Sequence, residues 1–162
     1  MSDDAAVFVR RLDAVRDRLG ALARREAPHG ALTAPDPPTG ERWQEGQVWA
    51  HLAEFIPYWL GEMDVVIEQA ATVAVPFGRT KTDPGRIAAV ERDRRTDRAL
   101  LWDRTAGDIA SLRAFLLGLG TSAWEARGLH STLGEMDLPA MVDEFLVGHL
   151  EQHAVQLEGL LT

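Results

Sequence analysis

The sequence predicts an all-α protein in which four long amphipathic helices form an antiparallel four-helix bundle. Apolar residues recur at spacings of three and four through most of the chain, as they do on the inner face of a helix. Alternation typical of a strand does not extend over any useful length, and segments rich in proline and glycine separate the helical stretches. The 162 residues provide one core and not comfortably two, so we expect a single domain over residues 1–162.

The first two helices are predicted over about residues 3–27 and 43–71, with a loop dense in proline and glycine between them. Pro57 lies inside the second helix, so we expect a kink or local break near Phe55. The inner stripe of this helix repeats at helical spacing and comprises Val48, His51, Leu52, Phe55, Trp59, Met63 and Val66.

The second half of the chain predicts two further helical regions. After an irregular segment, TVAVPFGRTKTDPG, the third region spans about 84–118, with Asp83 as its N-cap. Its pattern leaves open a break at 94–96. A second irregular segment, ARGLHSTLGEMD, precedes the last helix, which we expect to begin at Asp137 and to continue through Leu160. The long connections mean that a simple up-down-up-down order is not guaranteed.

The composition excludes several classes of function. A formal charge of −8 argues against a nucleic-acid binder, which needs a basic face, and against docking on an anionic membrane. No apolar run reaches membrane-spanning length, and the N-terminus lacks the features of a signal peptide, so we expect a cytoplasmic protein. Because the chain has no cysteine, any metal must be held by histidine or carboxylate side chains.

Two histidines occupy positions of the last helix where leucine would be expected. His149 and His153 are four residues apart, so they point the same way, and they share their stripe with Phe145 and Leu157. Two adjacent buried imidazoles are costly without a shared partner, and this spacing allows both to bind one divalent cation. The alternative for each is a core histidine whose hydrogen bonds are satisfied within the protein.

His51 can supply a third ligand, because it lies on the inner stripe of the second helix and a bundle can bring that helix beside the last one. Three neutral imidazoles would leave coordination positions open for water or substrate. The alternative is that His51 merely lines the core.

These elements carry a resemblance to a known family. The segment WAHLAEF, joined to HSTLGEMDLPAMVDEF and GHLEQHAVQL near the C-terminus, resembles the DinB/YfiT-like superfamily, and the likeness covers nearly the whole chain in element order. It implies a four-helix bundle in up-down-down-up order, often a homodimer. It also implies a metal site at His51, His149 and His153, usually holding nickel or zinc. Relatives include transferases and isomerases that use bacillithiol, mycothiol or glutathione, and metal-dependent hydrolases.

Two classes of function follow from these observations. The first is a metal-dependent enzyme acting on a small molecule, either a thiol transferase of the mycothiol or bacillithiol type or a hydrolase. Its sulfur nucleophile would be a low-molecular-weight thiol cosubstrate, because the chain has no cysteine. The second is a non-catalytic, stress-related binding or dimerisation module whose metal site is structural or vestigial. A structural site usually closes every position with protein ligands, and no fourth ligand is evident, so the sequence favours an open site.

No catalytic side chain is assigned from the sequence. Glu54 could act as a base at the rim, although an exposed helix carboxylate is the favoured interpretation, and Tyr58 is interpreted as a core or rim aromatic. Gln152 and Gln156 could support the histidine pair from behind, or could be ordinary polar helix residues.

Three loop residues have a possible role at the site. Arg79 and Arg86, between the second and third helices, could hold a carboxylate or phosphate of a substrate. A solvated loop is the favoured interpretation for both. His130 could overhang the mouth of the site or complete its coordination, and here a surface loop histidine is favoured. His29 lies in the proline-rich loop and has no assigned role.

Overall fold

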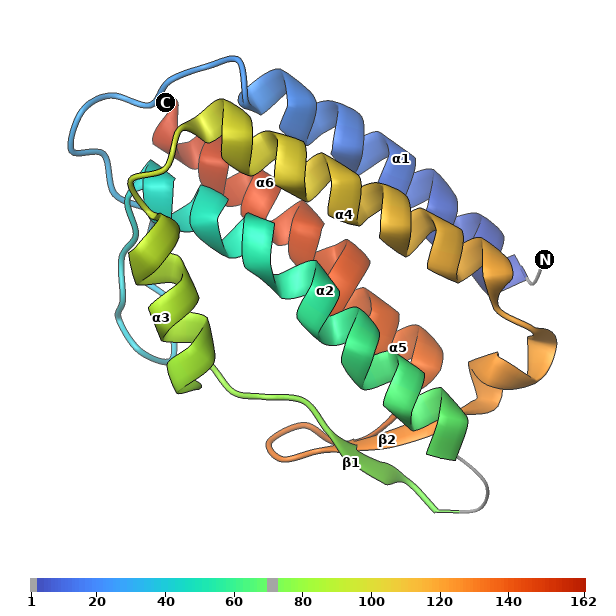
Figure 1. Ribbon diagram of the computed structural model, residues 1–162. Coiled ribbons are helices and arrows are strands. Elements are labelled where there is room, and N and C mark those ends of the chain that lie inside the picture. Colours follow the sequence, from blue (N-terminus) through green and yellow to red (C-terminus); the bar gives the residue numbers. More distant parts are fainter. Residues whose placement is uncertain (1–2, 70–72) are drawn as a thin grey trace.

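Four helices lie side by side and form a bundle in the computed structural model, which describes residues 3–69 and 73–162 (Figure 1). Helices α1 and α6 run in one direction and α2 and α4 run in the other. The order is therefore up-down-down-up, as the resemblance implied. The four bundle helices are α1 (Asp3–Leu22), α2 (Glu45–Gln69), α4 (Arg98–Gly118) and α6 (Gly148–Leu160).

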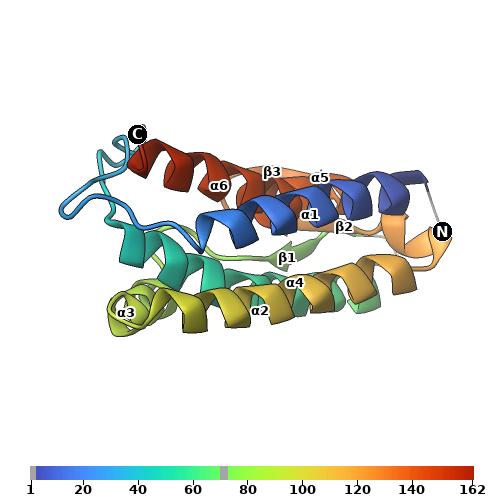
Figure 2. The same cartoon turned by 90° about the horizontal axis from the view of Figure 1, so that it is seen from above.

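The bundle has two layers, one made of α1 and α6 and the other of α2 and α4 (Figure 2). Contacts between the layers join α1 to α4 and α2 to α6. Both of these cross-layer pairs are antiparallel. The contact between α2 and α6 matters most for function, because these are the helices that carry the three predicted histidine ligands.

Helix α2 follows the predicted periodicity closely. All seven residues of its predicted inner stripe are buried, which confirms the face that the spacing indicated. The break expected near Phe55 is wrong, because α2 continues unbroken from Glu45 to Gln69. Pro57 is exposed, so its ring lies on the outer face of the helix, away from the core. The last predicted residues of this helix, 70 and 71, lie outside the described ranges.

The ends of the other helices differ from the expected ones in detail. The first helix ends at Leu22 rather than near residue 27. The third helical region is broken, as its pattern allowed, into α3 (Pro84–Asp93) and α4. Asp83 caps α3 by accepting a hydrogen bond from the backbone N–H of Arg86 at 2.8 Å. None of the described helices combines the length and apolar character needed to span a bilayer.

A small sheet that the sequence did not predict accompanies the helical bundle. Strands β1 (Val75–Phe77), β2 (Arg127–His130) and β3 (Gly134–Asp137) pair in that order, β1 parallel to β2 and β2 antiparallel to β3. Both segments that form it were expected to be irregular. Strands of three or four residues are too short to show a convincing alternation. The sheet packs against α2 through β1 and β2.

The last helix contains a feature that the sequence pattern does not reveal. It begins with α5 (Leu138–Val142), capped by Asp137, passes through the π-helical turn η2 (Asp143–Val147) and continues as α6. A Cβ atom on Gly148 would lie 2.5 Å from the backbone oxygen of Asp143, so the wide turn requires glycine at this position. His149 follows directly, and the π turn therefore sets the position at which the first ligand of the pair leaves the helix.

Candidate metal centre

The three predicted histidines come together between α2 and α6. The Nε2 atom of His149 lies 3.0 Å from Nε2 of His51 and 3.0 Å from Nε2 of His153. One ring nitrogen from each residue falls within a group whose members all lie within 4.8 Å of one another. His51 and His153 are buried, whereas His149 is half-buried. The open side of the group is therefore the side of His149.

Hydrogen bonds behind the rings decide which nitrogen carries the hydrogen. Nδ1 of His51 lies 2.7 Å from Oε1 of Glu54, and Nδ1 of His153 lies 2.6 Å from Oε1 of Gln156. Both oxygens accept, so each Nδ1 donates. A neutral imidazole carries a single N–H, and the Nε2 atoms of both rings therefore present lone pairs toward His149.

This arrangement leaves a conflict that a cation resolves. Nε2 of His149 carries at most one hydrogen, so it can donate to only one of the two lone pairs that face it. At least one of the two 3.0 Å contacts is then left without a hydrogen bond. Two nitrogens bound to one ion at ~2.1 Å lie ~3.0 Å apart at right angles and ~3.4 Å apart at the tetrahedral angle. The residues present thus fit a divalent metal ion, and the group can hold one.

The protonation of the rings also suits a metal. Burial, more than any nearby charge, lowers the pKa of all three histidines, for His51 and His149 well below the ordinary value and for His153 to about 4. The imidazoles are therefore neutral at neutral pH. Neutral imidazole is the form that coordinates metals.

A buried ion pair supports His51 from behind. Glu54 accepts hydrogen bonds from Nη2 of Arg79 at 2.7 and 2.6 Å, on its two carboxylate oxygens, as well as from His51. The side chains of Glu54 and Arg79 are only 9% and 10% exposed. Burial raises the pKa of Glu54, and the nearby guanidinium of Arg79 opposes this by lowering it. The favoured interpretations of an exposed carboxylate for Glu54 and a solvated loop residue for Arg79 are both wrong.

His130 is also buried rather than exposed in a surface loop. It lies in β2, and its Nδ1 accepts hydrogen bonds from the backbone N–H groups of Thr132 and Leu133, both at 3.3 Å. Its Nε2 therefore donates to the backbone oxygen of Arg79 at 3.2 Å. His130 is not a member of the three-histidine group. Instead it holds the loop that carries Arg79, and through Arg79 and Glu54 this loop is connected to His51.

Trp43 is a site residue that the sequence interpretation missed. Its ring lies parallel to that of His153, with centres 6.5 Å apart, and meets the ring of His51 edge-on at 5.4 Å. Thr33 fixes it, because the backbone N–H of each residue donates to an oxygen of the other, at 2.8 and 2.9 Å. Nothing in the periodicity reveals this position, since Trp43 precedes α2 in a loop.

The remaining candidates are less involved. Tyr58 lies beneath the guanidinium of Arg79, 4.0 Å from its carbon atom to the ring centre, and does not contact the histidine rings through any described interaction. Gln156 supports His153, as one of the two sequence interpretations held, whereas Gln152 and His29 are exposed.

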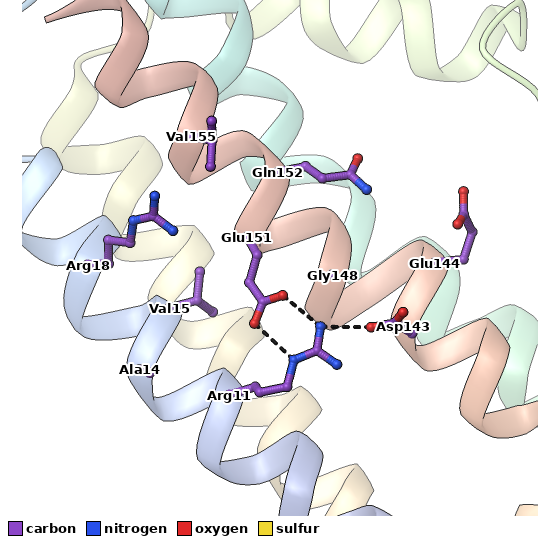
Figure 3. Close-up of a pocket in the computed structure, with 10 residues that line it drawn as sticks. All are labelled: Arg11, Ala14, Val15, Arg18, Asp143, Glu144, Gly148, Glu151, Gln152 and Val155. Atoms are coloured by element: carbon purple, nitrogen blue, oxygen red, sulfur yellow. Dashed lines mark hydrogen bonds and ion pairs between the residues drawn. The ribbon is translucent and has the colours of Figure 1, made fainter.

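A groove on the bundle lies away from the histidines. It has a volume of about 520 Å³ and runs between α1 and the junction of η2 with α6 (Figure 3). In it Arg11 bonds Glu151 at 3.0 and 2.6 Å and meets Asp143 at 2.7 Å. The histidines are not among the residues that line it. Because this arginine is already paired with carboxylates, we interpret the groove as a seam between helices rather than as the reactive site.

Comparison with known proteins shows the fold. No protein-family model matches the sequence, and no curated protein matches it. Among solved structures, the chain is similar to YfiT from Bacillus subtilis, described as a probable metal-dependent hydrolase with an unusual four-helix bundle topology. The TM-score is 0.73 at 17% sequence identity, over 99% of this chain and 87% of that one. The four-helix-bundle fold that the resemblance implied is thereby confirmed over nearly the whole chain.

Proposed function

We propose that this chain is a metal-dependent enzyme acting on a small molecule, in which His51, His149 and His153 hold one divalent ion, nickel or zinc. The observation that carries the proposal is the position of the His149 nitrogen, 3.0 Å from two ring nitrogens whose lone pairs face it. The description of YfiT as a probable metal-dependent hydrolase agrees with this reading.

Hydrolysis is the reaction that we favour. The three imidazoles would hold the divalent ion, which would supply Lewis-acid chemistry for the activation of water and the polarisation of a substrate carbonyl or phosphoryl group. Glu54 and Gln156 hold two of the ligand rings in place and fix their tautomers. The ring of Trp43 lies parallel to that of His153 and the ring of Phe55 lies perpendicular to that of His149, so both place apolar surface beside the histidines. Substrate would approach from the side of the half-buried His149.

Thiol transfer is the second candidate, supported by charge. Three neutral ligands leave the charge of the ion uncompensated, which favours an anionic partner such as a thiolate. The thiol would be a low-molecular-weight cosubstrate of the mycothiol or bacillithiol type. A purely structural site would require further protein ligands, and within the described ranges the group contains no fourth histidine, aspartate or glutamate.

The test compares zinc-loaded and nickel-loaded protein, purified without a tag, with the same protein after chelation. Chromogenic esters, amides and phosphoesters, and an electrophilic aromatic chloride, are offered with and without a low-molecular-weight thiol. Metal-dependent turnover without thiol supports hydrolysis, and turnover only with thiol supports transfer. His149→Ala should abolish either activity, whereas His29→Ala, which changes an exposed histidine, should not. Metal-loaded protein that is inert in every assay would favour the non-catalytic module.

The homodimer expected from the resemblance is part of this proposal. Two-fold dimers are the commonest oligomers of soluble proteins. Light scattering that shows only monomer across micromolar concentrations would contradict it.

A further inference from the structure

The indole ring of Trp43 lies between Arg86 and two of the candidate metal ligands. Arg86 belongs to the first turn of α3, and its guanidinium carbon is 5.1 Å from the centre of the Trp43 ring. The same indole lies parallel to the ring of His153 and edge-on to that of His51. Trp43 therefore connects this arginine to two of the three histidines.

Within the described part of the chain, Arg86 has no carboxylate in ion-pair contact. Its one side-chain hydrogen bond runs from Nη1 to the backbone oxygen of Lys81, at 2.9 Å. A guanidinium has five N–H donors, so four stay available. Of the three carboxylates whose charge acts on Arg86, Glu54 pairs with Arg79 and Asp36 with Lys81, and Glu41 acts on it without forming an ion pair.

This arginine is also partly withdrawn from water. Its side chain is half-buried, and burial lowers its pKa from the ordinary arginine value. A buried charge is costly unless it is paired. Arg86 is therefore better described as a half-buried cation able to bind an anionic ligand than as a solvated loop residue.

Charge at the site points the same way. After burial, the positive charge of Arg86 contributes to the low pKa of all three histidines, so its field reaches the whole group. Glu54 offsets it only in part: its charge raises the pKa of His153, but both of its oxygens bind Arg79. A divalent ion on three neutral ligands would increase this excess of positive charge.

We propose that Arg86 is the anion-recognising residue of this site, and that the substrate carries a carboxylate or phosphate group that its guanidinium binds while the reacting bond lies at the histidines. The planar fork of a guanidinium matches two oxygens of such a group. This inference deepens the proposed function and rests on it for the identity of the ligand as a substrate. It corrects the favoured sequence interpretation of Arg86 as a solvated loop residue.

The experiment measures binding of inorganic phosphate and of acetate by calorimetry, to both metal-free and zinc-loaded protein. The variant is Arg86→Gln, and the matched control is Arg95→Gln, which removes an exposed arginine beyond the far end of α3. Loss of a charge-assisted hydrogen bond predicts that Arg86→Gln weakens anion binding about ten- to hundredfold. The control should stay within about twofold of the wild type, and all three proteins should bind zinc with the same stoichiometry.

Either of two results would overturn the proposal: equal anion affinity in wild type and Arg86→Gln, or no binding of either anion to the wild type at tens of millimolar. The anion whose affinity depends more strongly on Arg86 identifies the group as phosphate or carboxylate. If zinc does not bind, but the metal-free protein loses phosphate affinity in Arg86→Gln, the metal function fails and the anion site stands. Should Arg86→Gln fold poorly, Arg86→Lys keeps the charge but not the fork, and we expect an intermediate loss.

Discussion

Replacing Glu54 by glutamine separates the two tasks of this buried carboxylate. The amide keeps one oxygen that can accept from Nδ1 of His51, but it no longer neutralises Arg79. The two side chains are 9% and 10% exposed, and the next carboxylate, Asp83, is 3.9 Å from Nη1 of Arg79. Removing one partner of a buried pair costs about 3–5 kcal/mol. Asp83 can still compensate part of the charge of Arg79, so we expect Glu54→Gln to lower the free energy of unfolding by about 3 kcal/mol, the lower end of that range.

Metal affinity should respond to the same substitution through His51. A carboxylate behind a ligand imidazole orients the ring and raises its basicity, and loss of such a partner typically weakens metal binding about 10–100-fold. Adding Arg79→Met removes the unpaired charge. The double variant should therefore recover more than half of the lost stability but little of the metal affinity.

Two measurements check this reasoning. Urea unfolding of the metal-free proteins gives the stability differences, and competition with a chromophoric chelator gives the zinc affinities. Wild-type zinc affinity in Glu54→Gln would refute the orienting role of the carboxylate. A double variant no more stable than Glu54→Gln would refute the unpaired buried charge as the cause of instability.

Three further predictions concern the bundle around the site. His153 has a pKa near 6.5 when unfolded and about 4 when folded, so the unfolded state binds more protons as the pH falls. This histidine alone should cost the metal-free protein about 3 kcal/mol of stability between pH 6.5 and 4, and the lowered pKa values of His51 and His149 should add to the loss. Constant stability by urea titration over this window would contradict the prediction. Gly148→Ala places a Cβ 2.5 Å from the Asp143 oxygen, so the free energy of unfolding should fall by about 1–3 kcal/mol and the zinc affinity should fall with it. An unchanged melting curve would show that the π turn adapts to the extra atom. Arg11→Met removes the partner of Asp143 and Glu151 and should cost about 1 kcal/mol, a difference that thermal unfolding in 1 M salt should reduce if its origin is electrostatic.

The helical part of the fold was predictable because burial follows a period. Every predicted inner position of α2, from Val48 to Val66, is buried, and the break between α3 and α4 occurs where the pattern weakens. The sheet was not predictable from local pattern, since β1 and β2 are three and four residues long and pair across about fifty residues of chain. The π turn was hidden for another reason. Its requirement for Gly148 depends on backbone geometry that a single glycine in a helix does not reveal.

The histidines of the site were predictable, whereas most of their supporting residues were not. His51, His149 and His153 replace apolar residues on inner stripes, which is an unusual and readable signal. Glu54 and Gln156 each follow a ligand by three residues, so the spacing was available, but the burial of Glu54 depends on a loop arginine. Arg79, Arg86 and Trp43 reach the site from irregular segments, whose course periodicity does not determine.

The central claim is that three histidines hold one divalent ion. The direct test is elemental analysis of the wild type, His149→Ala and His29→Ala, each purified without a tag and without exposure to a nickel column. We predict about one nickel or zinc per chain in the wild type and in His29→Ala, and its loss in His149→Ala. Absence of metal from all three proteins, even after incubation with divalent ions, would contradict the claim and leave three core histidines.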